Sequence, residues 1–226
     1  MIMKQYIISK IKNSFFLLIT SAFLYSLLSY IKLSGWCKNR IILKGSFLRK
    51  TKIKIQGRNN SLIISPENRL NNCLIYISGD NCQIKIDKHC ILKNVELWIE
   101  DNNGKIEIGY RSTIEGAHIS ATEGQSIIIG EDCMFSHGID IRNGDSHSIV
   151  DLKTGKRTNH AKQVVIGNHV WLGSDVKVLK GSIVKDGSII STGAIVTGQV
   201  DANSIYAGIP AKKIKENINW QRKRIS

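Results

Sequence analysis

Residues 164–200 read VVIGNHVWLGSDVKVLKGSIVKDGSIISTGAIVTGQV, and this stretch decides the fold. A large aliphatic residue recurs there at every sixth position: Ile166, Leu172, Val178, Val184, Ile190 and Val196. Four places after each of these stands a small or branched residue: Val170, Val176, Ser182, Ser188, Ala194 and Val200. A helix needs apolar residues about every 3.6 positions and a plain strand every second position, so neither explains this period. A short strand followed by a sharp turn explains it, and three such sides make one triangular coil.

The chain before this stretch carries a longer form of the same repeat. Four segments align, SLIISPE from Ser61, QIKIDKHC from Gln83, KIEIGYRS from Lys105 and SIIIGEDC from Ser126. Within them, the six-residue period runs from Ile108 to Ile114 and Ser120, and from Ile129 to Phe135 and Ile141. Each coil buries its apolar side only by stacking on its neighbours, which is the behaviour of a solenoid. We therefore predict an all-β fold that resembles the left-handed parallel β-helix.

The expected organisation has three parts. Residues 1–40 form an apolar, basic N-terminal helix, and residues 41–211 form the β-helix. Residues 212–226 form a basic tail that includes a short C-terminal helix.

The charge is divided unevenly along the 226 residues. The formal net charge is +14, but residues 1–58 hold 12 Lys and Arg and no acid. Residues 212–226 hold six basic residues and one acid, which leaves 14 basic and 17 acidic residues in the body. A uniform basic groove for DNA or RNA is therefore not expected.

The five cysteines, at positions 37, 73, 82, 90 and 133, form no C-x-x-C pair. This count and spacing favour neither a disulfide framework nor a zinc site. Cys73, Cys90 and Cys133 lie within apolar runs, where free cysteine behaves as a small hydrophobic residue. A reducing cytosol is the simplest setting for such a chain.

The N-terminal segment contains nineteen uncharged residues between Lys12 and Lys32, which is about the length needed to cross a bilayer core. Basic residues are more numerous after this stretch than before it, and this bias places the body in the cytoplasm. The sequence leaves two interpretations open. One is association with the cytoplasmic face of the inner membrane, and the other is a helix packed on the soluble body or on a partner subunit.

The repeat breaks between Ile129 and Ile166, which lie 37 residues apart, one more than a multiple of six. The break contains residues 142–163, rich in Gly, Asn, Asp, Ser and basic residues. A solenoid extrudes such a segment as a loop, and loops on a rigid scaffold often carry function. The loop holds His147 and His160, and His137 precedes it.

Four motifs resemble the hexapeptide-repeat acyltransferases that use acetyl-CoA. They are DSHSI at 145–149, VVIGNHVWLGSDVKVLKGS from Val164, STGAIVTG from Ser191 and NSIYAGIPAKKIK from Asn203. Within that family the chain is most similar to O-acetyltransferases of bacterial capsules, O-antigens and other surface polysaccharides. The resemblance covers roughly residues 60–215. It implies acetyl-CoA as co-substrate, a homotrimer, and a polysaccharide or lipid-linked glycan as acceptor.

The resemblance assigns catalysis to His147 and Trp171. A sugar hydroxyl is a weak nucleophile, and a histidine with a pKa of about 6.5 can take its proton near neutral pH. The indole N–H of Trp171 can donate to the thioester, or its ring can stack on a sugar or on the pantetheine. An outward tryptophan that merely covers the coils has the same sequence pattern. His137, His160 and His169 are expected to be ordinary loop or surface residues.

The resemblance also assigns binding residues. Those for CoA are Ser174, Thr192, Thr197, Lys212 and Lys215. The two lysines can pair with nucleotide phosphates as point charges. Asp145 can orient His147 or bind an acceptor hydroxyl, although turn formation is an equally good reason for an aspartate there. Arg142 opens a loop segment, 142–162, that has five basic and two acidic residues, a balance suited to an anionic polysaccharide.

Three alternatives keep the fold and change the function. A sugar-nucleotide or small-molecule N- or O-acetyltransferase shares the CoA motifs, although such relatives often carry an N-terminal βαβ domain. A non-catalytic solenoid would have no use for His147. A metal enzyme resembling γ-class carbonic anhydrase needs an H-x-x-x-x-H pair, which this sequence lacks, so no metal is expected.

Overall fold

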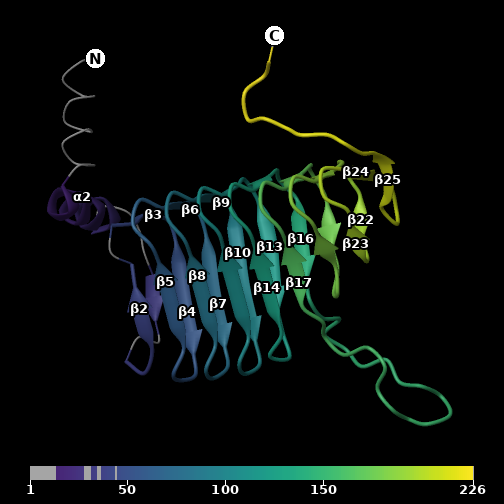
Figure 1. Ribbon diagram of the computed structural model, residues 1–226. Coiled ribbons are helices and arrows are strands. Elements are labelled where there is room, and N and C mark those ends of the chain that lie inside the picture. The colour runs from purple at the N-terminus through teal and green to yellow at the C-terminus, as the bar shows by residue number, and fades with distance from the viewer. Residues whose placement is uncertain (1–13, 28–31, 35–36, 44, 226) are drawn as a thin grey trace.

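The computed structural model describes residues 14–27, 32–34, 37–43 and 45–225. Across these ranges the chain winds into a prism of triangular coils (Figure 1). Sheet A contains β1 (Lys32–Ser34), β4 (Lys52–Gln56), β7 (Leu74–Ser78), β10 (Val95–Glu100), β13 (Ala117–Ala121), β16 (Ile139–Arg142), β19 (Lys177–Val178) and β22 (Ile195–Val196). Sheet B contains β2 (Arg40–Ile42), β5 (Ser61–Ile64), β8 (Gln83–Ile86), β11 (Lys105–Ile108), β14 (Ser126–Ile129), β17 (Val164–Ile166), β20 (Ile183–Val184) and β23 (Gln199–Val200).

Sheet C forms the third side. It contains β3 (Phe47–Arg49), β6 (Arg69–Asn71), β9 (Ile91–Lys93), β12 (Thr113–Ile114), β15 (Met134–Phe135), β18 (Trp171–Leu172), β21 (Ile189–Ile190), β24 (Ile205–Ala207) and β25 (Lys212–Lys215). Successive coils pair in parallel on every side, and the exception is β25, which pairs antiparallel with β24. The predicted left-handed β-helix is confirmed.

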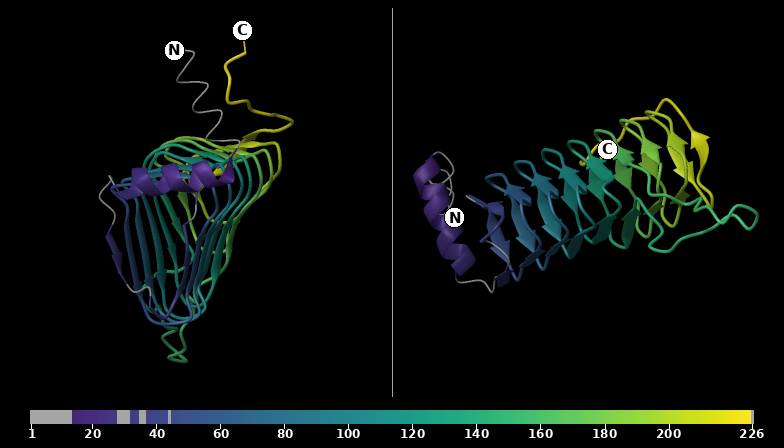
Figure 2. Two further views of the ribbon diagram at one scale, coloured as in Figure 1. Left: turned by 90° about the vertical axis from the view of Figure 1, so that its left-hand side faces the viewer. Right: turned by 90° about the horizontal axis from the view of Figure 1, so that it is seen from below.

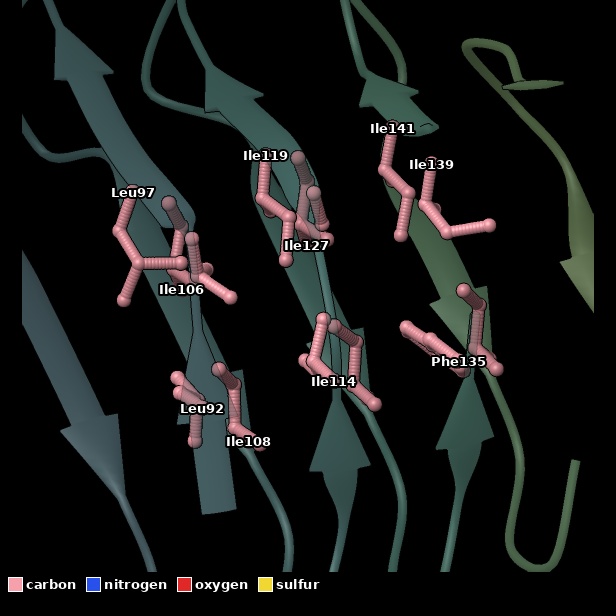
Figure 3. Packing of buried hydrophobic residues seen from close by; sticks show 14 of the residues in the cluster. Leu92, Leu97, Ile106, Ile108, Ile114, Ile119, Ile127, Phe135, Ile139 and Ile141 are labelled. Atoms are coloured by element: carbon pink, nitrogen blue, oxygen red, sulfur yellow. The ribbon is translucent and has the colours of Figure 1, made fainter. Parts of the chain in front are cut away.

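The core is a set of aliphatic columns that run along the prism axis. One column in sheet B passes through Ile86, Ile108, Ile129 and Ile166, which pair in register from coil to coil. Figure 3 shows how such side chains from three sides of each coil meet in the interior. All twelve residues of the predicted six-residue pattern between Ile166 and Val200 are buried. The period therefore identified the core of the C-terminal half correctly.

The expected position of Ser120 in that period is wrong. Ile119 is buried instead, and Ser120 points outward beside Trp98 and Arg142. The cause is the corner between sheets C and A. In an early coil the buried residues on either side of this corner, Leu92 and Val95, are three positions apart in the sequence. In a late coil the corresponding residues, Leu172 and Val176, are four positions apart. The late coils therefore have a wider corner than the early ones.

The three cysteines predicted to act as core residues, Cys73, Cys90 and Cys133, are free thiols buried among the columns. Cys82 is buried as well, whereas Cys37 is exposed. Burial raises the pKa of Cys73 and Cys133 to about 11 and that of Cys90 to about 12, because the thiolate loses its hydration. These thiols stay protonated at neutral pH and contribute as apolar groups.

One end of the prism is covered by α2 (Phe15–Leu27), which lies across the first coil (Figure 2). Leu18 and Ala22 are buried against the coil, and the ring of Tyr25 packs edge-on against Phe47 with centroids 5.8 Å apart. Its other side exposes Phe16, Phe23 and Leu24. The first coil already begins with β1, before the expected boundary at residue 41. Among the described residues, no helix is long and apolar enough to cross a membrane.

The expected short C-terminal helix is not formed. Residues 212–215 make β25, and the chain from 216 to 225 contains no helix. This tail turns back over the prism (Figure 1), where Trp220 is buried and Arg222 donates to Asp132 Oδ1 at 3.0 Å and to Cys133 O at 3.0 Å. Contacts with distant coils therefore fix the tail, and a local preference for helix is overridden.

Candidate functional site

The site residues predicted from sequence fall at two corners of the prism. The A/B corner joins sheet A to sheet B, and in the late coils it contains Asn143, Lys162, Gly181 and Gly198. The C/A corner joins sheet C to sheet A and contains residues 137–138, 174–175 and 192–193. The loop of residues 142–163 leaves the prism at the A/B corner, as Figure 1 and the left view of Figure 2 show.

His147 lies in the first turn of this loop, with its side chain exposed. The backbone N–H of His147 donates to Asp145 O at 2.7 Å, which closes a three-residue turn around Ser146. Ser146 has a φ of 63°, in the left-handed region that non-glycine residues rarely adopt. Such a conformation persists only where surrounding contacts impose it. The turn therefore needs a support, and Asn159 supplies one.

Asn159 is the buried centre of the loop, with 7% of its surface exposed. Its Nδ2 donates to Asp145 Oδ2 at 2.9 Å and to His147 O at 2.7 Å. Its Oδ1 accepts from the backbone N–H of Ile149 at 2.7 Å and from Arg157 Nε at 3.2 Å. Both polar atoms of one amide are thus used fully, and they tie the two arms of the loop together around His147.

Two ion pairs attach the loop to the prism. Lys180 binds the Asp145 carboxylate, and its Nζ also donates to Asn159 O at 3.2 Å. Arg157 binds Glu123, which precedes β14. The Lys180 ammonium and the Asn159 amide hold the pKa of Asp145 below its usual range, and Arg157 does the same for Glu123. Asp145 is therefore ionised at neutral pH and supports the turn.

Sequence reasoning identified His147 and Asp145 but missed Asn159, Lys180 and Arg157. Nothing in the local sequence marks these three residues. Asn159 and Arg157 are ordinary residues for a polar loop, and Lys180 lies 35 residues after its partner Asp145. Arg142, predicted to bind substrate, ends β16 and donates to Asp140 Oδ1 at 2.8 Å, so the structure places it on sheet A. His160 is exposed, and its Nδ1 lies 4.0 Å from Glu123 Oε2.

Trp171 lies on the outer face of sheet C, with 37% of its surface exposed. Its ring is tilted against that of Trp220, with centroids 6.1 Å apart. Trp220 in turn stacks on His169 at 4.0 Å, and its Nε1 donates to His169 O at 2.7 Å. The tail therefore packs beside Trp171, and His169 helps to hold the tail through its contacts with Trp220.

Ser174 and Thr192 lie together at the C/A corner, one coil apart. Their hydroxyl oxygens are 3.4 Å apart, and the N–H of Gly193 donates to Ser174 O at 2.9 Å. A Cβ at Gly173 would lie only 2.7 Å from the backbone nitrogen of Thr192, so the coils approach there as only glycine allows. The chain past β24 returns to the same corner, where the N–H of Ala211 donates to Ile195 O at 2.8 Å.

The remaining predicted CoA residues are spread more widely. Lys212 pairs with Ala207 at the start of β25, and Lys215 pairs with Ile205 at its end, both exposed. Thr197 follows β22 and therefore lies at the A/B corner. Six residue steps separate Ser174 from Lys180 across the width of sheet A, which is about 20 Å in an extended chain. A single chain therefore does not bring His147 together with Ser174 and Thr192.

No protein-family model matches the chain. The chain is 40% identical over 118 residues to a polysialic acid O-acetyltransferase of Neisseria meningitidis, which is 52% of this chain and 55% of the relative. It is 37% identical over 115 residues to a polysialic acid O-acetyltransferase of Escherichia coli O1:K1, which is 51% of this chain and 38% of the relative. The chain thus spans about half or less of the length of these curated relatives.

A solved structure extends the similarity over nearly the whole chain. This crystal structure of a polysialic acid O-acetyltransferase superposes with a TM-score of 0.77 and 32% identity, covering 86% of this chain and 88% of that chain. The chain belongs to the hexapeptide-repeat acyltransferases. As a hexapeptide-repeat acyltransferase, it follows the family in fold and carries the distinctive loop at the A/B corner. Among its described residues, no cluster of three His, Cys, Asp or Glu side chains is arranged to hold a metal ion.

The role of Asn159 can be tested without an activity assay. We expect Asn159→Leu to speed tryptic cleavage of the native loop, at Lys153, Lys156 or Arg157, by about tenfold or more, since four hydrogen bonds of about 1 kcal/mol each are lost. Cleavage is followed by mass spectrometry, and the melting temperature of the prism should change little. Leu152→Ala, at a fully exposed loop position, is the control. Equal cleavage rates in the two variants would show that Asn159 does not hold the loop.

Proposed function

We propose that this protein transfers the acetyl group of acetyl-CoA to a hydroxyl of a bacterial surface polysaccharide, such as a capsule or O-antigen. The observation that carries the proposal is the fixed turn that presents an exposed histidine, His147, at the mouth of a loop. The relatives add the reaction, because those at 40% and 37% identity are polysialic acid O-acetyltransferases.

In the proposed reaction His147 is the general base. An unprotonated ring nitrogen takes the proton of the acceptor hydroxyl while the hydroxyl oxygen attacks the thioester carbonyl. A C–O bond forms, the C–S bond breaks, and the CoA thiolate leaves and takes the proton from the imidazolium. Asp145 is paired with Lys180 and Asn159, so its proposed role is to hold the turn.

Acetyl-CoA is proposed to bind along the C/A corner. Ser174 and Thr192 present hydroxyl groups and backbone edges there, which suit the pantetheine amides. Lys212 and Lys215 are exposed on β25 and can pair with the nucleotide phosphates. Trp171 on the neighbouring face of sheet C can meet the thioester. Thr197, at the A/B corner, would contact CoA only from a different chain.

A homotrimer resolves the separation of the two corners. Three prisms that direct sheet A toward a common three-fold axis bring the A/B corner of each beside the C/A corner of the next. The outer face of sheet A suits an interface, since Tyr76 and Trp98 lie 4.5 Å apart there and His118 follows at 6.0 Å. The indole N–H of Trp98 is buried without an acceptor in the described part of the chain, and a neighbouring chain can supply one.

A second candidate acceptor is a sugar nucleotide or a small molecule. The positive charge of the loop favours an anionic polymer less than the sequence suggested. Two of its basic residues, Arg142 and Arg157, are paired with Asp140 and Glu123, which lie outside the loop segment. Three features favour the polymer: the relatives, the open loop, and the absence of any lid over His147 among the described residues. Incubation with labelled acetyl-CoA and either capsule, lipopolysaccharide or free sugar nucleotides separates the two, and label on sugar nucleotides alone would favour the second candidate.

We also propose that α2 associates with the cytoplasmic face of the inner membrane, where acetyl-CoA is available. The described part of the helix is about 20 Å long and suits an interfacial position. Its exposed Phe16, Phe23 and Leu24 form the apolar side. Lys38, Arg40 and Lys50, exposed in the first coil, can attract anionic headgroups.

The His147→Ala variant should lose about 10²–10⁴ of the transfer rate, the usual cost of losing a general base, and keep its affinity for acetyl-CoA. Thiol release from acetyl-CoA in the presence of polysialic acid gives the rate, and calorimetry gives the affinity. His160→Ala, in the same loop, is the matched control and should stay active. Half of the wild-type activity remaining in His147→Ala would mean that another group is the base.

Mixed trimers should reveal the shared site. Thr192→Trp blocks the C/A corner, and His147→Ala removes the base at the A/B corner, so each variant alone is expected to be inactive. Equal co-expression should restore about a quarter of the wild-type activity. In a cyclic trimer each site takes its A/B corner from one chain and its C/A corner from the next, and each corner is intact in about half of the chains. Native mass spectrometry checks that mixed trimers form. Mixed trimers without activity would refute a site shared between chains.

Membrane association should depend on the exposed side of α2. Phe16→Asp combined with Phe23→Asp should abolish co-flotation with vesicles that contain anionic phospholipid, since each carboxylate opposes burial of apolar surface. Ile183→Asp, an exposed apolar position on sheet B, is the control and should float as the wild type does. Failure of the wild-type protein to float at moderate salt would contradict the membrane proposal.

A further inference from the structure

A groove of about 790 Å³ lies on the outer face of sheet C in the early coils. Tyr25, near the C-terminal end of α2, stands at the β3 end of this groove, and Arg222 of the tail stands at the β12 end. Its floor is formed by side chains of β3, β6, β9 and β12. The groove therefore runs along the prism axis, across the strands.

Cations line this groove in a body that is otherwise mildly acidic. Arg49 and Arg69 are exposed, and neither forms an ion pair within the described ranges. Lys93 is paired with Glu115 at 2.9 Å, and Arg222 is anchored to Asp132 at 3.0 Å. Glu115 is the one acid of the lining, against four basic residues. The free guanidinium groups of Arg49 and Arg69 are suited to binding carboxylates in bidentate pairs.

The groove is aligned with the proposed reaction site. Residues that pair in register lead from Trp171 through Met134, Thr113 and Ile91 to Arg69. Because neighbouring strands lie about 4.8 Å apart, the groove begins about 10 Å from the Trp171 strand and reaches Arg49 at about 24 Å. If sheet A faces a three-fold axis, sheet C faces outward, and a polysaccharide that passes over Trp220 and Arg222 of the tail can lie along it.

We infer that this groove binds anionic sugar residues of the acceptor polysaccharide several units away from the hydroxyl that is acetylated. The inference rests on the proposed function, and it adds where the rest of the acceptor polysaccharide lies on the protein. Regularly spaced carboxylates would pair with Arg69 and Arg49, and the rings of Tyr25 and Phe47 would pack on sugar C–H groups. Arg49 and Arg69 lie on successive strands of the floor, and this spacing suits the repeated carboxylates of one polymer better than separate lipid headgroups.

The test compares long and short acceptors. Arg49→Gln combined with Arg69→Gln should raise the KM for polysialic acid of several tens of residues by about tenfold or more, through the loss of two charge-assisted contacts. The KM for acetyl-CoA, the kcat, and the KM for a sialic acid dimer should stay within about twofold of wild type, since these do not use the groove. Lys85→Gln combined with Lys105→Gln, at two cations on sheet B, is the matched control.

A binding measurement separates this inference from the proposed function. Fluorescence anisotropy with labelled polysialic acid and the His147→Ala protein reports groove binding without turnover, and neutral dextran should not compete. Unchanged affinity in the double arginine variant would overturn the inference even if acetyl transfer occurs. Loss of vesicle flotation with unchanged polysialic acid affinity would assign the groove to lipid headgroups and overturn it too. Absence of transfer by the wild type, with groove-dependent binding retained, would refute only the proposed function.

Discussion

Every feature of this molecule depends on one constraint: a coil can keep its apolar side dry only if another coil lies on it in register. A column such as Ile86, Ile108, Ile129 and Ile166 exists because each residue covers the next. Stability in such a solenoid is therefore built from contacts between neighbouring coils. The first and last coils each lack a neighbouring coil on one side, and the chain covers these two ends in different ways. At the first coil α2 buries Leu18 and Ala22, while at the last β25 pairs antiparallel with β24.

The same constraint explains what could be predicted from the sequence. Residues that repeat from coil to coil have one environment, so the period alone identified Ile166 to Val200 as core. Prediction was wrong where the geometry of a corner changes, as at Ser120, and where a segment meets distant residues. The tail was expected to be helical, but Arg222 binds Asp132, 90 residues away in sequence. No local pattern reports such a contact.

The candidate site was predictable to a similar extent. His147, Asp145 and the glycine-rich corner near Ser174 belong to motifs that can be read along the chain. Asn159 was not predictable, because its role comes from the way the loop folds back until one amide meets four partners. The distance between the A/B and C/A corners was equally hidden, since it depends on where each turn lies around the prism. The structure thus places the predicted site residues of one chain at two separate corners.

The length of sheet C also bears on how such proteins diverge. Each coil contacts only the coils beside it, so one can be duplicated or lost near α2 without moving Trp171, Ser174 or His147. Each such event would change the length of the outer face of sheet C by one strand spacing, about 4.8 Å. The number of early coils therefore sets the length of this face, and evolution can change it one coil at a time. The length of the outer face of sheet C and the geometry of the late corners are therefore free to vary separately.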